Sequence, residues 1–373
     1  MNNSSTQLIS RLGQATKSIA ISGLHRGENP QPGPSVIASI RRSFPSIRII
    51  GLSYDSLESS LYSDLGDQPD IAYSMPYPDI GPEALTERIE YILERENLIA
   101  IIPCLDLEIP NFISISPKLH EWGIKCILPT IQSLEVMNKS NLYNFCRQID
   151  VFSPKTKSAV NPSQLEFIAE ELGYPVYVKG RIYEAQLANS KQELIESSKS
   201  ISKLWGWPLL VQEALIGEEY NIAGLADGKG DIIASCSIRK FQRSSNGKGF
   251  AGVVIEDPEL DRLAKRIIKQ LHWNGPFELE FIKMSGKPHA LFEINPRFPA
   301  WVDFPSQVGC NLPARLIENL INKEHQPLQP CSAGQMFIRH SIDLVTNIAD
   351  IAEMTVTGEH ISAPITVQIE TTQ

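Results

Sequence analysis

Short apolar runs alternate with amphipathic segments through the first third of the chain. The runs "KSIAISG", "IRIIGLSY" and "LIAIIPCLD" predict buried strands, and "PEALTERIEYILEREN" predicts a helix with one apolar face. A further helix, "VIASIRRSF", would begin with Ser35 as its N-terminal cap. Strands that alternate with helices predict an open parallel sheet, in which ligands lie at the carboxyl ends of the strands.

Two features fall at that edge of the predicted sheet. The glycine-rich loop from Gly23 to Gly33 lacks the GxGxxG fingerprint, so an ordinary turn is favoured over a dinucleotide site. Asp106 and Glu108 follow the third apolar run and are either site residues or solvated loop carboxylates.

The middle of the chain has clear helix punctuation. In "NPSQLEFIAEELGYP", Asn161 is the expected cap, Pro162 takes the first helical position and Gln164 reaches back, while Gly173 and Pro175 stop the helix. The strand "YPVYVKG" follows and places Lys179 at its end. The segment "LLVQEALIGEEYNIAGLADGKGDIIASCSIRK" then predicts three antiparallel strands, joined by hairpin turns at "LIGEE" and "ADGKGD".

Polar residues interrupt two later apolar runs, "FELEFIK" and "LFEIN". Side chains of a strand alternate between its faces, so Glu278 and Glu280 share one face. A hairpin that turns at Gly286–Lys287 pairs Glu280 with Glu293, and Phe281 with Phe292. Two carboxylates would therefore face each other directly.

Like charges opposed in a ladder are destabilising unless a cation, a shared proton or solvent compensates them. The amide of Asn295 adds a third oxygen, and such a set suits Mg²⁺ held jointly with substrate phosphates. Arg297, two residues further on, suits a phosphate or a carboxylate. The alternative is a half-exposed hairpin with one polar face.

Composition narrows the class of protein. A chain of 373 residues suggests two or three domains. The net charge of −9 argues against nucleic acid or an acidic membrane as the main partner. The six cysteines show no CxxC spacing and predict reduced, mostly buried thiols in a cytoplasmic protein. Neither a signal peptide nor an apolar run of roughly 20 residues is present in the sequence.

Four motif blocks stand in one order along the chain, "MNKSNLY", "YPVYVKG", "LVQEALIGEEYNI" and the "ELEF…FEINPR" pair, and the resemblance that they carry extends over about residues 17–320. Together they resemble the ATP-grasp superfamily. The most similar group is the small ATP-grasp proteins that are like the large subunit of carbamoyl-phosphate synthetase, the carboxylate–amine ligase group.

The resemblance implies a role for each matching residue. ATP would contact Lys139 and Lys179, with adenine at the hinge of Gln212, Glu213, Ala214 and Leu215 and ribose at Glu219. Mg²⁺ would bind Glu280, Glu293 and Asn295, and the catalytic set would be Arg297, Lys179 and Arg239.

The implied fold class is α/β (α+β). A Rossmann-like pre-ATP-grasp domain, residues 1–129, would precede a two-part ATP-grasp domain with antiparallel sheets. The lid-bearing part would span residues 130–207 and the catalytic part 208–330, followed by a tail of short strands, 331–373.

The implied function is an ADP-forming ligase that joins a carboxylate to an amine through an acyl phosphate. Its partners would be a small-molecule or peptide carboxylate and an amine, with a homodimer open and no nucleic acid or membrane. A carbamoyl- or carboxyphosphate-type reaction, a peptide-modifying enzyme and a non-catalytic nucleotide-binding protein stay open as alternatives. A dinucleotide oxidoreductase is disfavoured because its fingerprint is absent.

Several positions keep two interpretations. The stretch after Lys179 lacks the glycines of many relatives, so Arg181 or Tyr183 would have to replace backbone amides around the phosphates. Residues 243–252 are a second cover or, as we favour, a surface loop. Arg239 and Lys240 either contact the substrate or form an exposed basic pair, and the aromatic residues Phe298, Trp301 and Phe304 line a pocket or belong to the core.

Overall fold

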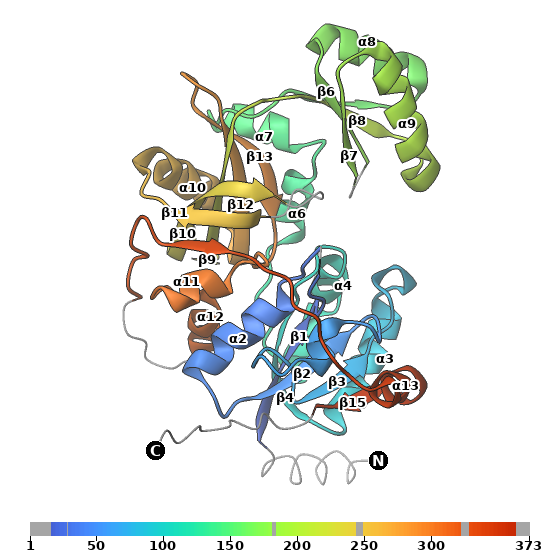
Figure 1. Ribbon diagram of the computed structural model, residues 1–373, viewed down its shortest axis with the longest axis vertical. Helices are drawn as coiled ribbons and strands as arrows, with labels where there is room; N and C mark the ends of the chain where they lie inside the picture. Colours follow the sequence, from blue (N-terminus) through green and yellow to red (C-terminus); the bar gives the residue numbers. More distant parts are fainter. Residues whose placement is uncertain (1–15, 28, 181–183, 244–248, 322–327, 363–373) are drawn as a thin grey trace.

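The computed structural model describes residues 16–27, 29–180, 184–243, 249–321 and 328–362. Figure 1 shows three parts along the long axis: a small sheet with two helices at one end, a central sheet, and a sheet flanked by helices at the other end. The small sheet, drawn in green, projects away from the remainder of the molecule.

The N-terminal part confirms the predicted open parallel sheet. Its strands β1 (Lys17–Ser22), β2 (Arg48–Ser53), β3 (Ile71–Ser74) and β4 (Asn97–Ile102) pair in parallel in the order β3-β2-β1-β4. The chain's last described strand, β15 (Glu359–Ile361), adds an antiparallel edge next to β3. Helix α13 (Ile348–Thr357) accompanies it, so the tail returns to the first domain (Figure 1).

The predicted cap of the first helix is wrong. Helix α2 (Gly33–Ser43) begins three residues earlier, after Pro32, and its N-terminus has no side-chain cap. The hydroxyl of Ser35 instead donates to the carbonyl of Ala300, at 2.7 Å. The early start depends on Gly33, because a Cβ there would lie 2.4 Å from the carbonyl oxygen of Ser22. The glycine-rich loop is therefore a close turn that packs the helix against the end of β1.

Further helices flank this sheet and the central one. They are α3 (Pro82–Leu93), α4 (Ile109–Ser114), α5 (Ser116–Glu121), α6 (Ile131–Met137) and α7 (Leu142–Gln148), with short 3₁₀ helices η1 (Ser59–Tyr62) and η2 (Pro78–Ile80).

The small sheet has its own core. Strands β5 (Thr156–Ala159), β8 (Leu209–Glu213), β6 (Val176–Lys179) and β7 (Ala185–Ala188) pack under helices α8 (Pro162–Leu172) and α9 (Lys191–Trp205). The predicted capping of α8 is confirmed: Asn161 accepts from the backbone N–H of Gln164, and the Gln164 side chain accepts from that of Val160. We call this part the lid.

The predicted hairpin at "LIGEE" is wrong. Strand β8 belongs to the lid, whereas β9 (Glu218–Asp227) belongs to the central sheet, so residues 214–217 cross from one sheet to the other. A Cβ on Gly217 would lie 2.3 Å from the carbonyl oxygen of Lys283, which is why glycine is needed at this crossing. A polar, glycine-containing turn looks the same in a hairpin and in a crossing, so sequence alone did not separate the two.

The central sheet has the strand order β13-β12-β9-β10-β11-β14. Its remaining strands are β10 (Ile232–Arg243), β11 (Gly249–Val254), β12 (Asn274–Lys283), β13 (His289–Asn295) and β14 (Met336–Ile338). The predicted β9–β10 hairpin is confirmed. Helix α10 (Pro258–Leu271), capped by Asp257 as predicted, covers the face that carries Phe277, Leu279 and Phe281. Helices α11 (Asp303–Gln307) and α12 (Leu312–Leu320) pack with α2 and with residues of the other face.

The predicted register of the β12–β13 hairpin is correct at its polar end and wrong at its apolar end. Glu280 pairs with Glu293, but a bulge then shifts the ladder, so Phe281 pairs with Leu291 and not with Phe292. A single inserted residue leaves the alternation of side chains locally intact on either side of it, and the sequence pattern does not reveal it. None of the described helices is long and apolar enough to cross a membrane.

Candidate functional site

Two neighbouring strands of the central sheet bring three carboxylates and one amide together. Glu280 lies opposite Glu293, and Glu278 lies opposite Asn295. The Nδ2 of Asn295 donates to Glu278 at 3.1 Å and to Glu280 at 3.0 Å. Within the described residues no donor bonds the amide oxygen of Asn295, so this oxygen is available to a cation.

Lys240 compensates the nearest carboxylates. It extends from β10, and its Nζ lies 2.7 Å from an oxygen of Glu280 and 3.4 Å from one of Glu219. Only 4% of its side chain is exposed. Burial alone would lower the pKa of Lys240, but these carboxylates outweigh burial and raise it. Lys240 therefore stays an ammonium inside the sheet, and the alternative of an exposed basic pair is wrong for it.

Arg239, its neighbour in the same strand, is not brought into this cluster. Its guanidinium pairs with Glu218 and lies over the ring of Phe241, at a surface where a third of the side chain is exposed. Successive residues of a strand point to opposite faces, so only one of the two cations could reach the carboxylates. The predicted catalytic role of Arg239 therefore has no geometric support, because Lys240, and not Arg239, lies beside Glu280.

Two lysines reach Glu293 from separate elements. Lys139, in the turn between α6 and α7, places its Nζ 3.7 Å from a carboxylate oxygen of Glu293. Lys179 ends β6 of the lid and is only 7% exposed. Burial lowers the pKa of Lys179 to about 8, although Glu293 acts in the opposite direction. The two predicted nucleotide lysines thus meet at the predicted metal ligands.

Arg297 is anchored by two carboxylates from two domains. Its NH1 donates to Glu278 at 3.2 Å, and its Nε and NH2 both donate to Asp106 at 3.3 Å. Burial opposes its charge, but Asp106 and Glu278 raise the pKa of the guanidinium. The predicted rim residue Asp106 therefore holds Arg297 in place across the boundary between the first domain and the central sheet.

Glu278 was not among the predicted site residues, although it accepts hydrogen bonds from four residues in the described structure. Besides Asn295 and Arg297, it accepts from Asn221 at 2.7 Å and from the indole N–H of Trp301 at 2.9 Å. Its side chain is buried, and four donors satisfy the charge that burial would otherwise penalise. The available signal was its place two residues before Glu280, on the same face of one strand.

A cavity of about 30 Å³ opens beside these charges, lined among others by Lys240, Arg297, Trp301 and Arg339. Arg339 follows β14 and donates to the carbonyl of Ala300 at 3.1 Å. Burial and the nearby Arg26 lower its pKa, and within the described residues it has no carboxylate partner. No motif in the tail marked this residue. Of the three aromatics, Phe298 and Phe304 lie in the core, and Trp301 also lines the cavity.

The predicted adenine hinge is the crossing from the lid to the central sheet. The side chain of Gln212 donates to Thr156 at 2.8 Å, and the backbone N–H of Ala214 donates to the carbonyl of Pro175 at 3.2 Å. Glu213 ends β8 and Leu215 is buried. Glu219, the predicted ribose contact, lies at the start of β9 beside Lys240. Their contacts with a nucleotide stay predictions.

One further predicted residue, Glu108, is described by the structure, and several others are not. Glu108 is not a solvated loop carboxylate: it is buried and accepts from Ser22, from Tyr54 at 2.6 Å and from two backbone N–H groups. It therefore fixes the ends of β1 and β4. The stretch with Arg181 and Tyr183, and residues 244–248 of the proposed cover, lie outside the described residues.

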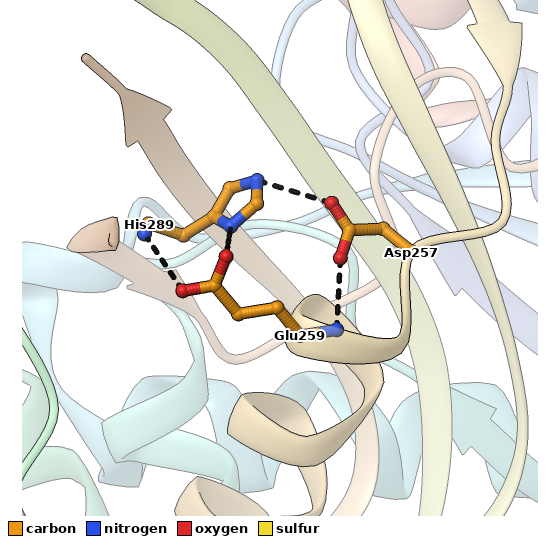
Figure 2. Close-up of side chains that lie close together, drawn as sticks. All are labelled: Asp257, Glu259 and His289. Atoms are coloured by element: carbon orange, nitrogen blue, oxygen red, sulfur yellow. Dashed lines mark hydrogen bonds and ion pairs between the residues drawn. The ribbon is translucent and has the colours of Figure 1, made fainter. Parts of the chain in front are cut away.

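A second cluster of ligand-type side chains lies towards the turn of the β12–β13 hairpin (Figure 2). The Nδ1 of His289 lies 2.9 Å from Glu259 and its Nε2 lies 3.4 Å from Asp257. The ammonium of Lys283 is 2.6 Å from Glu259 and thus already occupies the cation position of this cluster. We interpret it as a charge network that ties the hairpin to α10, and not as a metal centre.

Comparisons with known proteins agree with the ATP-grasp resemblance of the motif blocks. Residues 207–339 match the family described as ATP-grasp in the biosynthetic pathway with Ter operon. Similar solved structures include the L-amino acid ligase of Bacillus licheniformis, which is 13% identical over 87% of this chain and 79% of that one, with a TM-score of 0.64.

Two further structures have the same arrangement. The N5-carboxyaminoimidazole ribonucleotide synthetase of Thermus thermophilus is 15% identical over 85% of this chain and 81% of that one, with a TM-score of 0.63. The biotin carboxylase domain of the 2-oxoglutarate carboxylase of Hydrogenobacter thermophilus, in complex with MgADP, ADP and bicarbonate, is 17% identical over 84% of this chain and 71% of that one, with a TM-score of 0.63. At these identities the likeness establishes the fold.

Lys179 generates a prediction about pH. A bound triphosphate would restore its charged form, so nucleotide binding takes up a proton, and the affinity falls as pH rises above about 8. Calorimetry in buffers of different ionisation enthalpy measures that uptake. In the control Lys179→Arg the guanidinium stays charged, so proton uptake disappears and the affinity changes little with pH. A wild-type affinity equal at about pH 7 and about pH 9.5 contradicts this account.

Glu278 generates a prediction about stability. Glu278→Gln removes the charge that faces Arg297 and replaces one acceptor by an N–H₂ group among four donors. We expect a loss of about 2–3 kcal/mol in the free energy of unfolding, measured by denaturant titration. The matched control is Glu218→Gln, which removes an exposed ion pair with Arg239 and is expected to change stability by less than about 1 kcal/mol. Equal effects of the two substitutions would show that Glu278 has no special structural role.

Proposed function

We propose that the chain is an ATP-grasp protein and an ADP-forming ligase, which joins a carboxylate to an amine through an acyl phosphate. The observation that carries the proposal is the convergence of three parts on one cluster. The lid supplies Lys179, the central sheet supplies Glu280 and Glu293, and Asp106 of the first domain holds Arg297.

The donor chemistry of the cluster fits Mg²⁺. Glu280 and Glu293 face each other, and the amide of Asn295 turns its nitrogen to the carboxylates, which leaves its oxygen for a cation. All three ligand groups are oxygens, as this hard cation prefers. When bound, the ion would offset phosphate charge and favour the departure of ADP.

The chain's own residues would bind and orient the reactants. Lys139 and Lys179 both lie close to Glu293 and would bind the phosphates of a nucleotide held at the hinge. Arg297 is held by two carboxylates, so its guanidinium has a fixed place, and the one N–H of NH2 that these bonds leave over would donate to the transferred phosphoryl group. Leu215 and Glu219 would contact adenine and ribose.

The cavity beside Arg297 is the proposed place for the substrate carboxylate. Arg339 is mostly buried there and lacks an anionic partner among the described residues, and Lys240 lines the same space. A carboxylate between these cations would attack the γ-phosphorus of ATP, and the bond from that phosphorus to ADP would break. The amine then attacks the acyl carbon, loses a proton, and phosphate departs.

The kind of carboxylate, the oligomeric state, the domain bounds and the cellular setting belong to the same proposal. The carboxylate is either a small molecule or the end of a peptide, and the protein acts as a monomer or a homodimer. The divisions at residues 129 and 330 stay proposals, whereas the division at residue 207 is wrong, because β8 still pairs with the lid strands and the chain leaves the lid only after Glu213. All six thiols are free in the described chain, which supports a reducing, cytoplasmic setting.

The direct test incubates the protein with ATP, Mg²⁺ and pools of amino acids, small carboxylates, bicarbonate and peptides, and resolves ADP, AMP and phosphate over time. We expect ADP and phosphate that depend on one pool. Glu293→Gln should lower the rate by at least about a hundredfold, because it removes one of the two carboxylates that would hold Mg²⁺ at the phosphates.

The outcomes separate the alternatives. ADP release that requires bicarbonate alone favours the carboxyphosphate reaction, and release that requires a peptide favours the peptide-modifying enzyme. AMP in place of ADP contradicts the acyl-phosphate mechanism. ATP binding without turnover in any pool would support the non-catalytic alternative.

A further inference from the structure

The carboxyl edge of the first-domain sheet carries exposed apolar side chains from two of its loops. Tyr77 and Ile80 follow β3 and are 56% and 64% exposed, and Leu107 follows β4 and is 41% exposed. Single exposed apolar residues are ordinary at a protein surface. These three, however, belong to one edge of a parallel sheet, and ligands of such sheets bind outside that edge.

A series of contacts connects this edge to Arg297. The ring of Tyr77 stacks on that of Tyr54, with 6.3 Å between the ring centroids. The hydroxyl of Tyr54 donates to the buried carboxylate of Glu108 at 2.6 Å. Glu108 lies two residues after Asp106 in one turn, and Asp106 accepts two N–H groups of Arg297 at 3.3 Å. Tyr77 is therefore connected, through side chains in contact, to the cavity that Arg297 lines.

The same contacts hold the apolar surface in place. Tyr54 is fixed by its hydrogen bond to Glu108 and supports the ring of Tyr77. The backbone after Tyr77 is fixed as well, because Asn111 of α4 donates to the carbonyl of Pro78 at 2.7 Å. Figure 1 shows α4 on the side of the first domain that faces the central sheet. A surface that is ordered in advance binds an apolar group without a further entropic cost of ordering side chains.

The charges on the two sides of Arg297 differ in sign. The cavity side presents Arg339, which has no carboxylate partner within the part of the chain that the structure describes. The first-domain side presents Asp106, whose side chain is 27% exposed. One oxygen of Asp106 bonds Arg297, and its other oxygen has no donor among the described residues. A carboxylate is thus attracted to the cavity side and an amine to the first-domain side.

We propose that the amine substrate has an apolar side group, which packs on Tyr77, Ile80 and Leu107 while its amino group donates a hydrogen bond to Asp106. The inference rests on the proposed ligase and adds the class of its second substrate: a primary amine with an aliphatic or aromatic group. We call the three apolar side chains the apolar subsite. Sites for small molecules commonly combine such a surface with a few polar groups that fix the orientation of the ligand.

The experiment measures which amines support release of ADP. The protein receives ATP, Mg²⁺, and a pool of small carboxylates and N-acetylated amino acids, which have no free amine, together with one amine at a time. The amines are glycinamide, asparaginamide, leucinamide and phenylalaninamide. We expect kcat/KM for leucinamide and phenylalaninamide to be at least about tenfold higher than for the other two. Asparaginamide is nearly the same size as leucinamide, so a difference between them reports polarity.

Matched variants locate the subsite. Leu107→Asn and Ile80→Asn change polarity with little change in volume, and each should lower the ratio of kcat/KM for leucinamide to that for glycinamide by at least about fivefold. The control is Leu204→Asn, which alters a leucine of α9 in the lid that is 69% exposed, and it should keep the wild-type ratio. Circular dichroism verifies that each variant is folded, and sedimentation measures its mass.

The outcomes distinguish this inference from the proposed function. If no pair of carboxylate and amine releases ADP, the ligase is contradicted and the apolar subsite with it. ADP release at equal kcat/KM for all four amines, or at a higher value for glycinamide or asparaginamide, keeps the ligase and contradicts the subsite alone. A wild-type ratio in both Leu107→Asn and Ile80→Asn also contradicts it. If either variant splits a wild-type oligomer, the surface is a contact between copies of the chain and the inference is wrong.

Discussion

Two carboxylates, Glu280 and Glu293, face each other across the β12–β13 hairpin, and this repulsion constrains much of the surrounding structure. Cations from separate elements approach the pair. Lys240 comes from β10, Lys139 from the turn between α6 and α7, and Lys179 from the lid. The two opposed carboxylates of one hairpin thus explain why lysines from distant parts of the chain lie next to it.

Hydrogen bonds and ion pairs around Glu278 and Arg297 hold the charged side chains of the cluster in place. Glu278 accepts four N–H donors, and one of them belongs to Arg297, which Asp106 holds from the other side. Buried charges are tolerated when they are paired and hydrogen-bonded, and here each anion has such a partner. Arg339 is a cation without such a partner. It is mostly buried, and no carboxylate among the described residues pairs with it. An anion bound beside Arg339 would therefore compensate a buried positive charge.

The sequence predicted the parts of this site whose chemistry is local. Alternation along "FELEFIK" and "FEIN" was sufficient to pair Glu280 with Glu293, and apolar runs separated by helices predicted the parallel sheet. It failed where the outcome depends on tertiary contacts. The bulge after Glu280, the crossing at residues 214–217 and the choice between Arg239 and Lys240 all depend on which strand becomes the neighbour. The approach of Arg339 to Ala300 and to the cavity is a long-range contact that no local pattern encodes.

The opposed carboxylates Glu280 and Glu293 are proposed to hold a cation together with nucleotide phosphates. The most direct measurement is the affinity for ATP by calorimetry, with Mg²⁺ and with a chelator. We predict that Mg²⁺ tightens binding by at least about tenfold in the wild type and in Glu218→Gln, and that Glu293→Gln loses this dependence. An affinity for ATP that is the same with and without Mg²⁺, or a dependence that survives in Glu293→Gln, would contradict the account.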